Sequence, residues 1–110
     1  MIVILDNPDM GIDFELDMEL LDGVPYFSQK SILRALGYTQ TYPNMPNTAK
    51  PRTQTIPRIY RGQRHRIYYS IKDIGNLLDA LYVKFNEWAM AMSVTINRHF
   101  SQFMNHEDLD

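Results

Sequence analysis

Residues 13–27, DFELDMELLDGVPYF, decide the fold, because they hold the clearest strand and turn signals of the 110-residue chain. Apolar and acidic side chains alternate over the first eight of these residues, and a period of two is typical of a strand with one buried face. The pair Asp22-Gly23 is a hairpin signal, so the residues after it are predicted to return as a second strand. Pro25 favours an edge position for that strand, since proline donates no backbone hydrogen bond.

A short helix is predicted after this hairpin, over residues 28–38, SQKSILRALGY. Ser28 or Ser31 can cap its first turn, and Gly37 can supply the left-handed residue that ends it. Its apolar residues are predicted to face the core: Ile32, Leu33, Ala35 and Leu36. Residues 39–57 contain four prolines and show no periodicity, so they are predicted to form a long polar loop of functional or mobile character.

Residues 58–70, RIYRGQRHRIYYS, predict a second hairpin that is rich in arginine and tyrosine. With a three-residue loop at residues 61–63, one face is basic and aromatic and carries Arg58, Tyr60, Arg64, Arg66 and Tyr68. The opposite face, expected to be the core face, carries Ile59, His65, Ile67 and Tyr69. A different loop length would exchange these positions between the faces.

Residues 70–104 predict a long helix, which the capping pair Ser70 and Asp73 would begin. An apolar stripe continues through it at Ile71, Ile74, Leu78, Leu81, Phe85, Trp88 and Met92. Because an unbroken helix would be about 50 Å long, which exceeds a compact domain of this size, two alternatives stay open. Either the helix breaks near Ser93, or its distal half forms a homodimer interface through Trp88, Met92, Ile96 and Phe100.

The predicted fold class is therefore α+β, with small antiparallel hairpins packed against a short helix and a long C-terminal helix. A chain of this length predicts a single domain over residues 1–110, with residues 1–12 and 105–110 frayed. The absence of cysteine excludes disulfides and thiolate metal sites and fits a reducing cytoplasm. No apolar run approaches the ~18 residues of a membrane span, so a soluble protein of a bacterial or phage-infected cell's cytoplasm is expected.

Charge is segregated along the chain, although the net charge is only −2. Residues 1–22 hold seven acids and no Lys or Arg, residues 23–72 hold nine bases and no acid, and residues 73–110 hold six acids and two bases. Because patch charge sets the potential near a surface, the acid-free segment predicts contact with a polyanion. The alternative is a solvated basic face that is paired with the acidic N-terminal strand.

No sequence motif for catalysis, nucleotide binding or metal binding is present. The histidines His65, His99 and His106 lack the spacing of metal ligands, and the acidic N-terminal residues alternate as a solvated strand face would. We therefore expect no enzyme activity, no cofactor and no metal. The candidate nucleic-acid-binding residues are Lys50, Arg52, Arg58, Tyr60, Arg61, Arg64, Arg66 and Tyr68.

Residues 23–38, GVPYFSQKSILRALGY, resemble the opening of the BRO-type N-terminal domain of phage antirepressors. That family typically shows a short strand, an aromatic pair and a small helix that ends in L-G-Y. The matching positions are Tyr26, Phe27, Lys30, Ile32, Ala35, Leu36, Gly37 and Tyr38. Residues 61–78 resemble the family's basic hairpin and following helix, so the resemblance covers about residues 14–82.

There are departures from this family pattern. Ser31 stands where the family often has an acidic residue, and the family's longer loop and second, C-terminal domain have no counterpart. Residues 56–78 also resemble the wing and following helix of MerR- and excisionase-type winged helices, although the proline-rich residues 39–57 leave no second recognition helix. Both resemblances imply nucleic-acid binding in mobile elements.

The residues and the resemblances together predict a small DNA-binding regulatory protein of phage or mobile-element type, whose arginine hairpin contacts phosphates. The alternative is a phage-encoded protein-interaction module or inhibitor, which would bind a host or repressor protein through its acidic strand or apolar helix. A structural subunit held by the long helix is a third hypothesis. Expected partners are thus duplex DNA, a second copy of the chain, or another protein, but no membrane.

Overall fold

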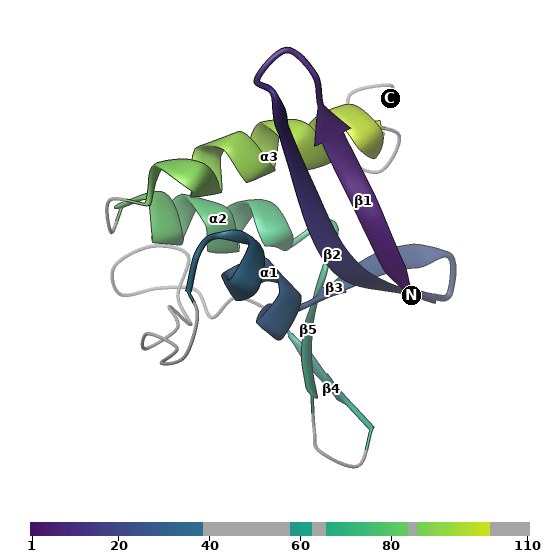
Figure 1. The fold of residues 1–110 in the computed structure, drawn as a ribbon. Coiled ribbons are helices and arrows are strands. Elements are labelled where there is room, and N and C mark those ends of the chain that lie inside the picture. The colour runs from purple at the N-terminus through teal and green to yellow at the C-terminus, as the bar shows by residue number, and fades with distance from the viewer. Residues whose placement is uncertain (39–57, 63–65, 84–85, 102–110) are drawn as a thin grey trace, which may run out of the picture.

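The computed structural model describes residues 1–38, 58–62, 66–83 and 86–101, and it confirms the predicted α+β class (Figure 1). Five antiparallel strands form one sheet in the order β1-β2-β3-β5-β4. Their bounds are Ile2–Asn7 (β1), Ile12–Leu21 (β2), Val24–Ser28 (β3), Ile59–Arg61 (β4) and Arg66–Ser70 (β5). The helices are Gln29–Ala35 (α1), Ile74–Val83 (α2) and Glu87–His99 (α3). The predicted loop at 39–57 and the tail at 105–110 lie outside the described residues.

The N-terminal residues form the edge strand β1, so the prediction that residues 1–12 fray was wrong. β1 pairs with β2 over its whole length, from Ile2 opposite Asp17 to Asn7 opposite Ile12. The sequence pattern did not predict this strand, because its outward-facing residues Ile2 and Ile4 are apolar. The alternation of apolar and polar residues that marks a half-buried strand is therefore missing.

The hairpin between β2 and β3 is the one that Asp22-Gly23 predicted. Asp22 has φ 53° and Gly23 has φ 79°, as a two-residue type I′ turn requires. The edge position predicted from Pro25 was wrong, because β3 is the central strand of the sheet. Pro25 lies just beyond the last β3–β5 pair, Tyr26 with Ser70, and its carbonyl accepts from the Ile71 N–H at 2.8 Å. Because proline has no N–H to return that bond, the ladder between β3 and β5 ends there.

The short helix α1 follows β3 directly and begins and ends as predicted. The Ser28 hydroxyl accepts from the backbone N–H of Ser31 at 3.2 Å, which caps the first turn. Gly37 ends the helical segment in the left-handed region, with φ 94°. Ile32 and Leu33 are buried, as expected for the core-facing side.

The predicted long helix is two helices, and the break lies earlier than the sequence suggested. The Ser70 hydroxyl accepts from the Asp73 N–H at 3.2 Å, as the predicted capping pair requires, and α2 begins at the next residue. Asn86 caps α3 by accepting from the N–H of Trp88 at 3.1 Å. The break therefore precedes Asn86, whereas Ser93 lies inside α3.

One buried cluster joins the inward face of the sheet to all three helices. Met92 and Ile96 are 0% and 1% exposed in this cluster, and the Phe100 ring meets the Phe27 ring edge-on at 5.6 Å between centroids. Three of the four residues predicted for a dimer interface thus pack inside the protomer, and only Trp88, at 52% exposure, is on the surface. That interface was wrongly placed, because the second helix folds back onto its own sheet.

Candidate functional site

The basic hairpin has a register different from the predicted one. Arg61 lies opposite Arg66, and Ile59 lies opposite Tyr68, so four residues and not three separate the strands. This shift places Arg66 and Tyr68 on one face with Ile59 and Arg61, and it moves Tyr60 to the other. Among the described cations of the hairpin, Arg58 lies beside Tyr60 on one face and Arg61 and Arg66 lie on the other, so these three do not form the single basic face that the sequence predicted.

Two of the predicted nucleic-acid-binding residues instead bind carboxylates of the acidic strand β2. Tyr68 is only 4% exposed, and its hydroxyl donates to an Asp17 carboxylate oxygen at 3.4 Å. Its burial, followed by the charges of Asp17 and Glu19, raises the pKa of Tyr68 above its ordinary value. Arg61 lies on the same face, with its Nε 3.6 Å from a carboxylate oxygen of Glu19. The predicted role of Tyr68 as a nucleic-acid contact was wrong because the ring is buried, and Arg61 is paired as the alternative interpretation expected.

Tyr60 on the outer strand β4 is open to solvent, and Arg58, just before this strand, is half-buried. Tyr60 is 54% exposed, and its hydroxyl accepts from Arg58 Nε at 3.2 Å. This hydrogen bond raises the pKa of Arg58 and stabilises its charged form. The pair thus offers a fixed guanidinium beside an exposed aromatic ring, a combination suited to a phosphate and an adjoining sugar or base.

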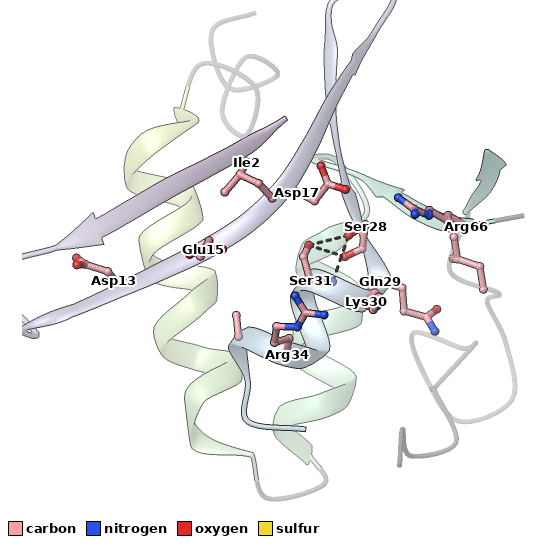
Figure 2. Close-up of a pocket in the computed structure, with 12 residues that line it drawn as sticks. Ile2, Asp13, Glu15, Asp17, Ser28, Gln29, Lys30, Ser31, Arg34 and Arg66 are labelled. Atoms are coloured by element: carbon pink, nitrogen blue, oxygen red, sulfur yellow. Dashed lines mark hydrogen bonds between the residues drawn. The ribbon is translucent and has the colours of Figure 1, made fainter. Parts of the chain in front are cut away.

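A cavity of about 580 Å³ lies between β2, α1 and the start of β5 (Figure 2). Carboxylates from β2 line one side of it: Asp13, Glu15 and Asp17. Cations from α1 and β5 line the other side: Lys30, Arg34 and Arg66. Within the described part of the chain, none of these three cations forms an ion pair.

Lys30 and Arg34 were missed as site residues by the sequence interpretation, because they precede the hairpin by about thirty residues. The signal was available, since both belong to the acid-free segment 23–72. Their spacing of four residues places them on the same side of a helix, and α1 carries that side to the start of β5. The fold thereby gathers Arg66 with two cations that the sequence keeps apart.

The remaining predicted residues, Lys50, Arg52 and Arg64, lie outside the described residues. Across the described ranges, no three His, Asp or Glu side chains gather as a metal site would require. No helix among the described residues is both long and apolar enough to cross a membrane.

Comparison of the chain with known protein families, curated proteins and solved structures found no match. The resemblance to the BRO-type domain therefore stays a prediction. Any function has to be inferred from the charges, contacts and exposure of the residues themselves.

Proposed function

We propose that this chain is a small DNA-binding regulatory protein of phage or mobile-element type. Its phosphate contacts are made by Arg66 together with Lys30 and Arg34, and by Arg58 beside the exposed ring of Tyr60. The observation that carries the proposal is the convergence of three cations from two distant segments on one cavity, with no ion pair to a described carboxylate.

Free cations favour a polyanion for an electrostatic reason. An exposed cation that already faces a carboxylate gains little from a phosphate, because the existing partner must be displaced. Lys30, Arg34 and Arg66 have no such partner among the described residues, so each can release a DNA counterion on binding. Arginine adds bidentate geometry, which suits phosphate oxygens.

The carboxylates of β2 restrict how the DNA approaches. Asp13, Glu15 and Asp17 form the opposite side of the same cavity, and they repel phosphates. We therefore expect the duplex to contact the α1 and β5 side, where Figure 2 shows Lys30, Arg34 and Arg66, and to stay away from the β2 side. This asymmetry orients the domain and predicts a modest number of phosphate contacts.

The test is a titration of labelled random-sequence duplex DNA at a series of salt concentrations. Arg66→Ala is compared with Lys72→Ala, which removes the same charge from an exposed residue that does not line the cavity. We expect Arg66→Ala to weaken binding and reduce the slope of log K against log salt by about one unit. Lys72→Ala should keep the slope of the parent. Equal slopes for the parent and Arg66→Ala, or parent binding that does not depend on salt, would overturn the proposal.

A further inference from the structure

The outer edge of β1 carries backbone groups that the sheet leaves open. The Met1 carbonyl accepts from the Met18 N–H at 2.8 Å, so every second residue from Met1 onward bonds to β2. The N–H and C=O groups of Ile2, Ile4 and Asp6 therefore point away from β2. The Asp6 carbonyl shows this direction directly, because it accepts from Nε2 of His99 at 2.8 Å.

The open part of this edge is centred on Ile2 and Ile4. His99 occupies the edge at Asp6, whereas no hydrogen bond from the described part of the chain reaches the outward backbone groups of Ile2 or Ile4. Their side chains are 59% and 64% exposed. Edge strands are usually protected by charge, proline or a covering segment, so an open edge with two exposed isoleucines is suited to pairing with another strand.

The surface beside this edge is acidic. Ile2 lies opposite Asp17, Ile4 opposite Glu15 and Asp6 opposite Asp13, so a row of carboxylates runs along β2 next to the two isoleucines. A strand that adds to β1 with lysine or arginine on this face would lay its apolar stems over the isoleucines. The charged ends would then reach toward Glu15 and Asp17.

A second copy of this chain fits the edge less well than a basic strand does. Two copies joined through β1 would form one continuous sheet around a two-fold axis. The acidic strands β2 of both copies would then share one face, with like charges on both sides of the seam. Charge complementarity thus selects an extended basic segment.

We propose that β1 binds an extended, basic segment of a partner protein, which adds a sixth strand to the sheet. Main-chain hydrogen bonds to Ile2 and Ile4 supply the pairing, and the carboxylates of β2 select lysine or arginine. The proposal does not depend on DNA binding, because its hydrogen bonds use the outward backbone of the edge strand β1 (Figure 1), although Ile2, Glu15 and Asp17 also line the cavity. It is a specific form of the alternative hypothesis, in which the chain binds a protein through its acidic strand, now identified as β2.

The test uses three blocked octapeptides, titrated into the ¹⁵N-labelled chain and followed by amide shifts. One alternates lysine with valine, the second alternates lysine with proline, and the third alternates glutamate with valine. The lysine–valine peptide should shift the amides of Ile2 and Ile4. The lysine–proline peptide, with equal charge but too few N–H donors, and the glutamate–valine peptide should each bind at least about tenfold more weakly. Equal binding of the first two peptides, or shifts that map elsewhere, would overturn the proposal.

Ile4→Pro provides the matched change in the protein. It removes an outward N–H without removing a bond to β2, and edge strands tolerate proline at such positions. We expect binding of the lysine–valine peptide to weaken about tenfold, while Ile4→Val, which keeps the N–H, binds like the parent. DNA affinity should not change in either variant. Parent-like peptide binding by Ile4→Pro would contradict the proposal.

Two further measurements keep the proposal open to refutation if Ile4→Pro does not fold. Glu15→Gln removes the charge of an exposed side chain beside Ile4. It should weaken binding of the lysine–valine peptide and not that of the glutamate–valine peptide. Retention of full affinity in this variant would show that charge does not select the ligand. A free-protein dimer seen by sedimentation, with Ile2 and Ile4 at its interface, would assign the edge to a second copy and overturn the choice of occupant.

Discussion

The hydroxyl of Tyr68 on β5 donates to a carboxylate oxygen of Asp17 on β2, across the intervening strand β3, at 3.4 Å. Asp17 also pairs with the N-terminal ammonium of Met1 at 3.0 Å. One carboxylate therefore links the start of β1, the middle of β2 and the buried ring of β5. This contact explains why a tyrosine in the middle of a basic segment is not available to a ligand.

The buried phenol of Tyr68 predicts a loss of stability at alkaline pH. Its pKa is raised in the folded protein, first by burial and then by Asp17 and Glu19. The stabilising contribution is therefore fully present below the unfolded pKa of about 10 and is lost as pH rises through the higher folded value. Tyr68→Phe should show a shallower alkaline fall in the free energy of unfolding than the parent, measured by urea unfolding from pH 8 upward.

The control for that experiment is Tyr82→Phe, because Tyr82 is 45% exposed on α2. This variant should keep the alkaline fall of the parent. Absorbance at 295 nm provides a second measurement. Burial also raises the pKa of Tyr69, so the parent should contain two tyrosines that ionise above the ordinary value, and Tyr68→Phe should lose one of these two components. Identical titrations of the parent and Tyr68→Phe would contradict the assignment.

Replacement of Asn7, at the end of β1, should lower the free energy of unfolding more than its position near the terminus suggests. It is 1% exposed, its Nδ2 donates to Thr95 Oγ1 at 3.3 Å, and its Oδ1 accepts from Arg98 at 2.8 Å. Asn7→Ala should lower the free energy of unfolding by about 1–3 kcal/mol, since buried polar partners lose their bonds. Asp9→Asn changes the exposed partner of Arg98 and should stay within about 0.5 kcal/mol. Similar urea midpoints for both variants would refute the buried network.

Local signals in the sequence were sufficient for the parts of the fold that form locally. Asp22-Gly23 specified a turn with two positive φ angles, and Ser28 specified the start of α1, because both act within three residues. Strand β1 was missed because the apolar side chains of Ile2 and Ile4 point to solvent. Its partner strand, which the alternation did reveal, gave no indication of what lay on its other side.

The site was harder to predict because it depends on register and on distant pairs. One additional loop residue exchanged the faces of the basic hairpin, and no residue near Gly62 specifies that length. The convergence of Arg34 with Arg66 requires β3 to pair with β5 across a long intervening segment. The helix break was misplaced because the apolar stripe continues in phase across it, while the capping residue Asn86 is a weaker signal.

Two glycines predict opposite effects of the same substitution. Gly23 has φ 79°, and Gly75 lies in α2, yet an added Cβ would meet no atom within 4 Å at either position. Gly23→Ala should therefore destabilise by roughly 1–2 kcal/mol through backbone strain alone. Gly75→Ala should stabilise by roughly 0.5–1 kcal/mol, because alanine restricts the unfolded chain and favours the helix. Urea unfolding of both variants checks the signs, and a stabilising Gly23→Ala would contradict the turn geometry.

The orientation of α3 predicts different outcomes for two methionines that are two residues apart. Met92 is 0% exposed in the core, whereas Met90 is 44% exposed on the same helix. Met92→Lys should lower the free energy of unfolding by more than about 4 kcal/mol or prevent folding, because it buries an unpaired charge. Met90→Lys should change it by less than about 0.5 kcal/mol. Circular dichroism with urea measures both.

The same pair of variants tests where a homodimer, if the chain forms one, has its interface. Because Met92 lies in the core, the parent should not form a dimer through the buried face of α3. Met90→Lys should therefore sediment with the same mass as the parent. If Met92→Lys instead folds as well as the parent and converts a dimer to a monomer, Met92 lies at a dimer interface and not in the core. The interface predicted from the apolar stripe would then be correct, and the packing of α3 against β1 would be wrong.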